Sequence, residues 1–332
     1  MAENKQKVDL RPKETLEDKR NSLRPKRIDG FIGQENLKSN LKTYIISSEK
    51  RKMNLDHIIL YGPPGLGKTT LAHIIASEKN VNIHSTSGPA FTKKGDLVTL
   101  LSNLTNGDIL FIDEIHRLSP IIEETLYPAM EDYKCDYIIG SGPSARVMQI
   151  SIEKFTLIGA TTRLGLLSRP LRDRFGIPLQ LNFYNPDDLN QIVQLNSKKL
   201  DITIEEKASL EIAKRSRGTP RIAIRLLKRI IDFSIVKDVR EINYAIVTDS
   251  LKRMRIDSEG LDDMDRKYMK CILIDYNGGP VGIETLSAAL LEQKDIIEDV
   301  IEPYLMQRGL VQRTSRGRIL SKKGQDHINI NI

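Results

Sequence analysis

The strongest constraint on the fold is a glycine-rich stretch, G-P-P-G-L-G-K-T-T, at residues 62–70. The apolar run 57–61 precedes it and a helical pattern at 71–79 follows it, which is the strand–loop–helix context of a phosphate-binding loop. Glycines let backbone N–H groups close around phosphate oxygens, and the helix adds the positive end of its dipole. The predicted ligands in this loop are Gly65, Gly67, Lys68, Thr69 and Thr70.

A second motif predicts metal binding and hydrolysis. The segment I-L-F-I-D-E at 109–114 ends an apolar strand with two adjacent acids. Lys68 would reach the β and γ phosphates, and the hydroxyl of Thr69 would hold Mg²⁺. Asp113 would bind the same ion through water, and Glu114 would orient or deprotonate the attacking water. We therefore expect Lys68, Asp113 and Glu114 to be catalytic in the hydrolysis of a nucleoside triphosphate.

The pattern around these motifs predicts an α/β fold. Short runs rich in isoleucine and leucine, typical of buried parallel strands, lie at 57–61, 108–112, 155–160 and 177–181. Helical stretches lie between them, which favours a mostly parallel sheet covered by helices. The third run ends in Thr161 and Thr162. Either threonine is placed to contact the γ-phosphate or the attacking water.

At 332 residues the chain is long enough for two or three domains. Residues 1–22 are polar and patternless, which predicts a flexible arm, and the large sheet domain spans 23–184. The segment N-P-D-D-L opens an all-helical domain over 185–255, whose best helix places Ala223, Leu226, Leu227 and Ile230 on one face. Three helices (261–275, 283–291 and 296–308) and a β-hairpin (310–320, turning at S-R-G) predict a winged-helix domain over 258–332.

Several arginines have few acids nearby in the sequence to balance them; for Arg169, Arg172 and Arg174 the only one is Asp173. The segment S-R-P-L-R-D-R-F-G places Arg174 after the third strand, at a site already supplied with ligands from its own chain. We expect this arginine to complete the nucleotide site of the next subunit in a head-to-tail ring. The alternative is a loose surface pair with Asp173. Arg221, in G-T-P-R at the start of a helix, is a candidate γ-phosphate contact.

The excess of positive charge, +7, is concentrated near the C-terminus. Between Arg308 and Lys323 there are six basic residues and no acid. Such a cluster indicates a phosphate-binding surface for nucleic acid, although a solvated basic surface is the alternative. Arginines without an obvious base-reading helix predict binding that does not depend on DNA sequence.

Other features exclude some classes of protein. No run of about 18 apolar residues is present that would span a bilayer. The first 14 residues mix both charge signs and lack the apolar core of a signal peptide, and the two cysteines have neither metal-site nor disulfide-framework spacing. A cytoplasmic location is therefore expected.

In order, the chain contains G-P-P-G-L-G-K-T-T, L-F-I-D-E-I-H-R, G-A-T-T-R, P-L-R-D-R-F-G and G-T-P-R. This set resembles the AAA+ ATPases and, among them, the bacterial RuvB family of Holliday-junction branch-migration motors. The resemblance covers nearly the whole chain from residue 23. It implies an ATP-driven homohexameric ring around double-stranded DNA, acting in recombination and repair. The alternatives are a clamp loader or replication initiator, or a DNA-binding scaffold switched by ATP.

The resemblance also implies roles for single residues and segments. It implies an adenine pocket at Leu23, Arg24 and Tyr184, sensors at Thr161 or Thr162 and at Arg221, and a trans arginine finger at Arg174. Residues that would face a neighbour's nucleotide are Glu131, Asp132 and Tyr133, and the implied DNA contacts are Lys294, Arg313 and Arg318. The hairpin at 137–150 would dock on RuvA through Ile138, Ile139, Val147, Met148 and Ile150, unless it is buried; the resolvase RuvC is a further implied partner.

Overall fold

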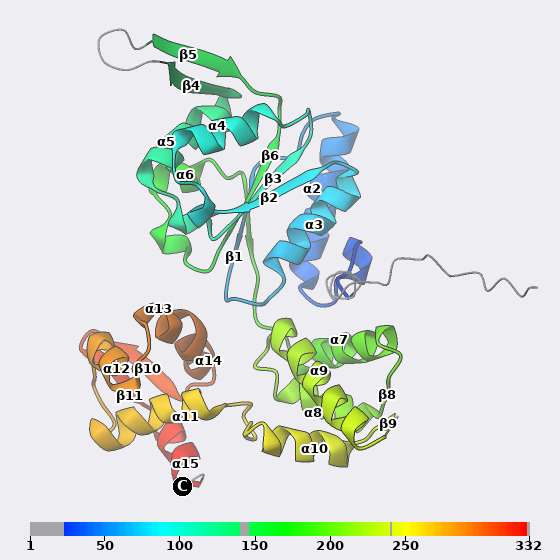
Figure 1. The fold of residues 1–332 in the computed structure, drawn as a ribbon, viewed down its shortest axis with the longest axis vertical. Helices are drawn as coiled ribbons and strands as arrows, with labels where there is room; N and C mark the ends of the chain where they lie inside the picture. Colours follow the sequence, from blue (N-terminus) through cyan, green and yellow to red (C-terminus); the bar gives the residue numbers. More distant parts are fainter. Residues whose placement is uncertain (1–22, 140–145, 240, 331–332) are drawn as a thin grey trace, which may run out of the picture.

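The computed structural model describes residues 23–139, 146–239 and 241–330. The predicted arm at 1–22 lies outside the described residues, as do the side chains of 137–147. Three bodies are visible in Figure 1: a large sheet domain, a helical domain and a smaller domain that contains the C-terminus. This is the predicted α/β ATPase domain, helical lid and winged helix.

The large domain is built on a five-stranded parallel sheet in the order β2-β3-β6-β1-β7. The strands are β1 (Ile58–Tyr61), β2 (Ile83–Ser87), β3 (Ile109–Asp113), β6 (Thr156–Thr161) and β7 (Ile177–Gln180). Because all five run in one direction, the loops after their carboxyl ends meet at one edge, where ligands bind in open α/β sheets.

Four of these strands were predicted and β2 was not. Its sequence, I-H-S-T-S, lacks a buried apolar run, and its residues are only half-buried or exposed. This strand lies at the edge of the sheet, paired only with β3. An edge strand needs less apolar surface than a central one, so hydrophobicity gave no signal here.

Helices cover both faces of the sheet (Figure 1). They are α2 (Glu35–Lys50), α3 (Lys68–Lys79), α4 (Lys94–Ser102), α5 (Pro120–Glu131) and α6 (Arg169–Asp173), with the short 3-10 segments η1 (Ile28–Gly30), η2 (Gly88–Ala90), η3 (Ile115–Arg117) and η5 (Leu164–Leu166). An antiparallel hairpin, β4 (Lys134–Ile139) and β5 (Arg146–Ser151), projects from this domain at the top of Figure 1.

The lid is helical apart from one two-residue strand pair. It contains α7 (Pro186–Lys199), β8 (Thr203–Ile204), α8 (Glu206–Lys214), α9 (Pro220–Val236), β9 (Glu241–Ile242) and α10 (Tyr244–Arg253). The Asn185 side chain caps α7 by accepting a hydrogen bond from the backbone N–H of Asp188, at 2.7 Å. The four apolar residues predicted for one face of α9 are all buried.

The C-terminal domain has the predicted three helices and hairpin. Its elements are α11 (Asp263–Lys270) continuing into the π-helical η6 (Cys271–Asp275), α12 (Ile283–Leu290), the continuous helical segment α13 (Lys294–Ile296), η7 (Ile297–Ile301) and α14 (Glu302–Gln307), then β10 (Val311–Thr314), β11 (Gly317–Leu320) and α15 (Lys322–Ile330). Val281 adds a third, one-residue bridge to Arg318. The terminal helix α15 was not predicted; it buries Ile328 in the domain core.

Among the described residues, no helix combines the length and the apolar character needed to cross a membrane. Both cysteines are free thiols, and both are buried.

Candidate active site

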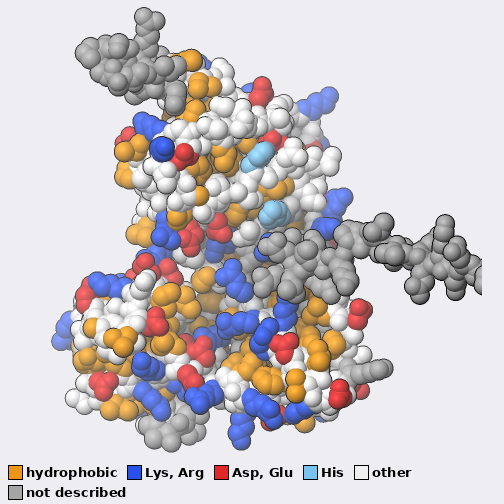
Figure 2. Space-filling model, viewed as in Figure 1, with side chains coloured by type: hydrophobic (Ala, Val, Ile, Leu, Met, Phe, Trp, Pro, Cys, Tyr) orange, Lys and Arg blue, Asp and Glu red, His pale blue; other side chains and the backbone are white. Residues whose placement is uncertain are grey.

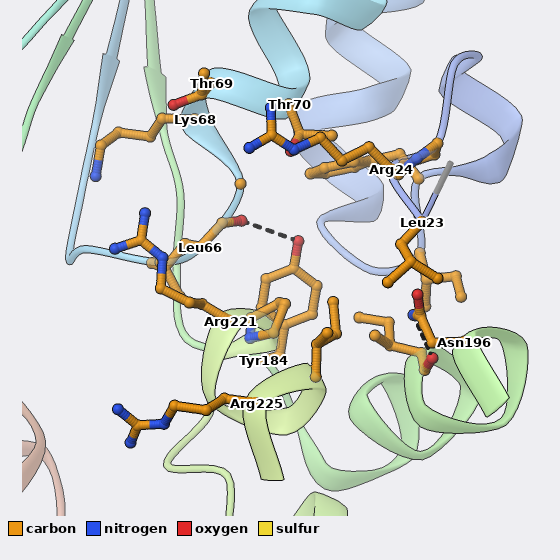
Figure 3. Close-up of a pocket in the computed structure, with 18 of the residues that line it drawn as sticks. Leu23, Arg24, Leu66, Lys68, Thr69, Thr70, Tyr184, Asn196, Arg221 and Arg225 are labelled. Atoms are coloured by element: carbon orange, nitrogen blue, oxygen red, sulfur yellow. Dashed lines mark hydrogen bonds between the residues drawn. The ribbon is translucent and has the colours of Figure 1, made fainter. Parts of the chain in front are cut away.

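A cavity of about 710 Å³ lies between the carboxyl edge of the sheet and the lid. The phosphate-binding loop forms one side, and the first turns of α9 form the other (Figure 3). Most of the nucleotide ligands predicted from the sequence line it: Leu23, Arg24, Gly65, Gly67, Lys68, Thr69, Thr70, Asp113, Glu114, Thr162, Tyr184 and Arg221. This volume is typical of small-molecule sites.

The loop has the backbone conformation that its glycines permit. Gly65 and Gly67 have φ of +79° and +103°, where L side chains are strained. A Cβ at Gly65 would also lie 2.8 Å from the Cγ2 atom of Thr219 in the lid. The loop therefore approaches the lid backbone closely and turns its own backbone directly into α3, whose N-terminus faces the cavity.

Lys68 is the most strongly perturbed cation at the site. Its Nζ donates hydrogen bonds to the carbonyl oxygens of Gly62 and Pro63, at 2.7 and 2.9 Å. Its pKa is lowered to about 8, chiefly by burial; Asp113 opposes the shift and nearby Arg221 adds to it. A poorly solvated ammonium beside a second cation favours an anionic ligand, as phosphate oxygens would provide.

The metal-binding candidates lie next to each other. The hydroxyl of Thr69 donates to Oδ2 of Asp113 at 3.4 Å. Such oxygen donors suit Mg²⁺, which keeps waters and takes few protein ligands. The residues present therefore fit the predicted ion. Glu114 lines the same cavity and pairs with Arg117 at 3.0 Å, on the surface.

The two threonines at the end of β6 differ in position. Thr161 is buried, and its hydroxyl bonds with Nδ1 of His116 at 2.9 Å and accepts from the backbone N–H of Arg163 at 2.9 Å. Thr162 lines the cavity, whereas Thr161 does not. Thr162 is therefore the threonine placed to meet a bound phosphate.

The lid contributes backbone contacts as well as side chains. The N–H of Arg221 donates to the carbonyl oxygen of Gly65 at 3.3 Å. The hydroxyl of buried Tyr184 donates to the carbonyl oxygen of Leu66 at 3.2 Å (Figure 3). Burial raises the pKa of Tyr184, so it remains a neutral donor. The bond from Arg221 joins the lid directly to the phosphate-binding loop, and the bond from Tyr184 holds the last residue of the large domain, next to the lid, on the same loop.

The helix α9 brings more cations to the cavity than the sequence predicted. Arg225, Lys228 and Arg229 also line it. Figure 3 shows Arg225 one turn beyond Arg221 on the same helix. Figure 2 shows Lys and Arg side chains gathered over the lid on this face. The signal available in the sequence was their spacing of four, seven and eight residues from Arg221, which places them on the same helix face.

The opposite end of the cavity is apolar. Leu23 is buried, and its carbonyl oxygen accepts a hydrogen bond from Nζ of Lys199 in the lid, at 3.2 Å. Ile192 and Leu195 of α7 complete this end. An apolar pocket closed by the N-terminal segment fits a nucleotide base.

Arg174, the expected trans finger, does not line the cavity of its own chain among the described residues. Its guanidinium pairs with Glu131 at 3.0 Å, donates to the carbonyl oxygen of Pro170 at 2.8 Å, and lies 4.5 Å from the ring of Tyr127. The alternative partner from the sequence, Asp173, pairs with Arg169 instead. Arg174 is thus held in a defined position, away from its own nucleotide site.

The two residues after Glu131 differ in exposure. Asp132 is exposed, whereas the half-buried ring of Tyr133 packs edge-on against Phe155 at 6.2 Å. Neither residue lines the cavity of its own chain, within the described ranges.

The three predicted DNA contacts have different surroundings. Arg313 on β10 is exposed, with 59% of its side chain accessible and a weak pair to Glu298 at 3.4 Å. Lys294 is exposed and pairs with Glu284. Arg318 is only 6% exposed and pairs with Glu298 and Glu302. A buried guanidinium with two carboxylate partners argues against the predicted DNA contact of Arg318, and its position assigns it to holding the hairpin in place.

A hairpin was predicted over 137–150, and the strands of the projecting hairpin pair over a longer stretch, from Lys134 with Ser151 to Ile139 with Arg146. Met148 is exposed and Ile150 is half-buried. The side chains of Ile138, Ile139 and Val147 lie outside the described residues.

Comparison with known proteins identifies the same three units. Residues 23–181 match the family description "Holliday junction DNA helicase RuvB P-loop domain", residues 184–257 match "RuvB AAA lid domain", and residues 258–329 match "RuvB C-terminal winged helix domain". Together these matches cover most of the chain.

Relatives and solved structures agree with the family matches. The chain is 54% identical over 320 residues to the Holliday junction branch migration complex subunit RuvB of two strains of Orientia tsutsugamushi, covering 96% of this chain and 98% of each relative. Among solved structures, the RuvB branch-migration motor of Thermotoga maritima is 51% identical, with a TM-score of 0.86, covering 92% of this chain and 98% of that one.

Proposed function

Because the chain belongs to the RuvB family of AAA+ motors, we propose that it hydrolyses ATP at the cavity between the sheet and the lid. The family activity is ATP-driven branch migration of Holliday junctions, in recombination and repair. A clamp loader, an initiator or a non-hydrolysing scaffold is not favoured. We divide the chain into an arm (1–22), the ATPase domain (23–184), the lid (185–255) and the winged helix (258–332).

Nucleotide binding uses groups from several parts of the ATPase domain. Leu23, Arg24 and Tyr184 hold the base, and the loop from Gly65 to Thr70 holds the phosphates. Thr69 and Asp113 would hold Mg²⁺, which when bound neutralises charge on the phosphates and orients them for in-line attack. Their contact at 3.4 Å supports this assignment.

Hydrolysis uses the acid and the sensors at the sheet edge. Glu114 orients or deprotonates the attacking water, Thr162 contacts the γ-phosphate, and Arg221 contacts it from the lid. The bond from Arg221 to the loop, together with that from Tyr184 at the domain boundary, supports a lid that moves with nucleotide state.

The arginine finger of each nucleotide site comes from the neighbouring subunit. Arg174 reaches the γ-phosphate of the next subunit in a ring of six, with Glu131, Asp132 and Tyr133 at the same subunit boundary. In support, the guanidinium of Arg174 is positioned by Glu131 and Tyr127 outside its own cavity. Such a head-to-tail contact makes hydrolysis depend on assembly.

The partners follow from the surfaces. Arg313, assisted by Lys294, binds the backbone of double-stranded DNA without reading its sequence. The 137–150 hairpin docks on RuvA, and RuvC joins the complex at the junction. A motor that acts on bacterial chromosomal junctions works in the cytoplasm, and we propose that location.

The observation that carries this proposal is the convergence of the loop, Glu114, Thr162 and Arg221 on one cavity. The test is phosphate release and dissociation of a synthetic four-way junction, with and without ATP and a RuvA protein. We expect wild type to show both activities and Glu114→Gln to lose both while still binding ATP. The exposed residue Glu124 provides the control Glu124→Gln, expected to match wild type. Equal rates for wild type and Glu114→Gln would refute the assignment.

A further inference from the structure

Arg163 directly follows the two threonines of β6, and neither the motifs nor the proposed function gives it a role. Its backbone N–H is bound to the hydroxyl of Thr161, but its side chain leaves the ATPase domain and enters the winged helix. Nε donates to Oδ1 of Asp299 at 2.6 Å, and a terminal nitrogen lies 3.0 Å from Oδ1 of Asp295. Only 23% of the Arg163 side chain is exposed. The contact joins two domains more than 100 residues apart in the sequence.

The helical segment that receives Arg163 is acidic, which is unusual for a DNA-binding domain. The third helix of the winged helix, 294–307, carries Asp295, Glu298, Asp299 and Glu302 and only one basic residue, Lys294. These acids repel DNA phosphates, so the helix beyond Lys294 is unsuited to lie against a duplex. Its acids instead contact arginines from the ATPase domain and from the wing.

One acid of this helix is shared between the two domains. Glu298 lies 3.9 Å from Arg163, 2.9 Å from Arg318 and 3.4 Å from Arg313. Arg313 is the exposed arginine to which we assign DNA binding. The positive charge of Arg163 near Glu298 therefore weakens the attraction between Glu298 and Arg313, and withdrawal of Arg163 strengthens that attraction.

Arg163 is also linked to the hydrolysis site, through the end of β6. His116 is two residues beyond Glu114, in η3, and its Nδ1 bonds with the hydroxyl of Thr161. The same hydroxyl holds the backbone of Arg163, and Thr162 between them lines the nucleotide cavity. A displacement of this strand end on γ-phosphate binding moves Arg163 with it, because only one peptide unit separates the sensor from the arginine.

We propose that Arg163 is a positioning residue that couples nucleotide state to DNA grip through the acidic helix of the winged-helix domain. When Arg163 is docked on Asp295 and Asp299, Glu298 holds Arg313 only loosely, at 3.4 Å, and Arg313 can exchange this partner for a DNA phosphate. When the strand end withdraws Arg163, Glu298 holds Arg313 more tightly and the grip on DNA weakens. This inference rests on the proposed function, since it takes Thr162 as the sensor and Arg313 as a DNA contact.

The test is a charge-reversal cycle on the full chain. Arg163→Glu, Asp299→Arg and the double variant are compared by their affinity for duplex DNA in the presence of a non-hydrolysable ATP analogue and of ADP. The measured quantity is the ratio of the DNA affinity with the ATP analogue to the DNA affinity with ADP. We expect each single variant to reduce this ratio by about fivefold or more, since fivefold is the lower limit of typical coupling between sites. The double variant should regain most of it, because the pair is restored with reversed sign.

Two further variants separate coupling from folding. Arg163→Gln removes the charge with a smaller change in shape, and it should reduce the same ratio. Arg253→Ala breaks an exposed lid pair with Asp249 and should match wild type. An unchanged ratio in Arg163→Gln, or a folded double variant without recovery, would overturn the inference. Failure of the proposed function looks different, since wild type itself would then neither hydrolyse ATP nor move junctions.

Discussion

Removing the Arg318 side chain should destabilise the β10–β11 hairpin, rather than simply remove a contact with DNA. The guanidinium pairs with Glu302 at 2.8 Å, and the two side chains are 6% and 3% exposed. The hydroxyl of Tyr268 also donates to Glu302, at 2.9 Å. Arg318→Ala leaves this buried carboxylate without its positive partner, a change that destabilises proteins by about 3–5 kcal/mol.

The measurement is hydrogen exchange of the backbone amides in β10 and β11. A loss of about 3 kcal/mol corresponds to roughly a hundredfold faster exchange through local opening, because about 1.4 kcal/mol is a factor of ten. The replacement Arg318→Met with Glu302→Met removes both charges together and should recover much of the protection.

The matched control is Arg313→Ala, since Arg313 is the residue opposite Arg318 in the hairpin register. Its exposed pair with Glu298 is worth only about 0–1 kcal/mol, so exchange should change little. Loss of one phosphate contact should instead reduce the slope of log affinity against log salt by about 0.9. The reasoning is refuted if Arg318→Ala keeps its exchange protection and lowers the salt slope as Arg313→Ala does.

Two predictions concern the nucleotide cavity. Burial lowers the pKa of Lys68 to about 8, so above that pH the nucleotide-free protein loses an ammonium charge that bound phosphates would retain. ATP binding above pH 8 should therefore take up a proton, and the dissociation constant of ATP should rise by up to about tenfold per pH unit. Calorimetric titration at about pH 9 in buffers of different ionisation enthalpy measures this uptake, and identical observed heats in all of these buffers would count against it. Tyr184→Phe removes the buried hydrogen bond to Leu66 and should weaken ATP binding by about five- to tenfold, the effect of about 1 kcal/mol or slightly more. The exposed lid residue Tyr244 gives the control Tyr244→Phe. Equal affinities of Tyr184→Phe and wild type in a fluorescent-nucleotide titration would show that the Tyr184 hydroxyl does not contribute to ATP binding.

The order of helices and strands could be predicted because the signals for it, apolar runs and motifs, are made of residues that are adjacent in the sequence. The strand–loop–helix around Lys68 and the strand that ends in Asp113 and Glu114 follow from short apolar runs and fixed motif spacing. The face of α9 followed from helical periodicity, and all four of its predicted residues are buried.

The parts that could not be read depend on contacts between distant segments. Arg318 lies in a basic cluster in the sequence, but the fold places Glu298 and Glu302 against it, so its neighbours in the chain did not indicate its burial. Arg163 meets its carboxylate partners only through packing of two domains. Thr161 and Thr162 are adjacent in sequence, and only the direction of each side chain distinguishes a buried hydroxyl from one at the cavity.

The most direct test of a site shared between subunits is a mixture of two inactive variants, Glu114→Gln and Arg174→Ala. Each variant alone lacks one group at every site of its ring. In an equal mixture, about a quarter of the sites should combine an intact Glu114 with an intact Arg174 from the neighbour, if subunits mix at random. We expect phosphate release to reappear on mixing, at a corresponding fraction of the wild-type rate. A mixture of exchanged subunits that remains as inactive as its components would show that Arg174 does not act across the subunit boundary.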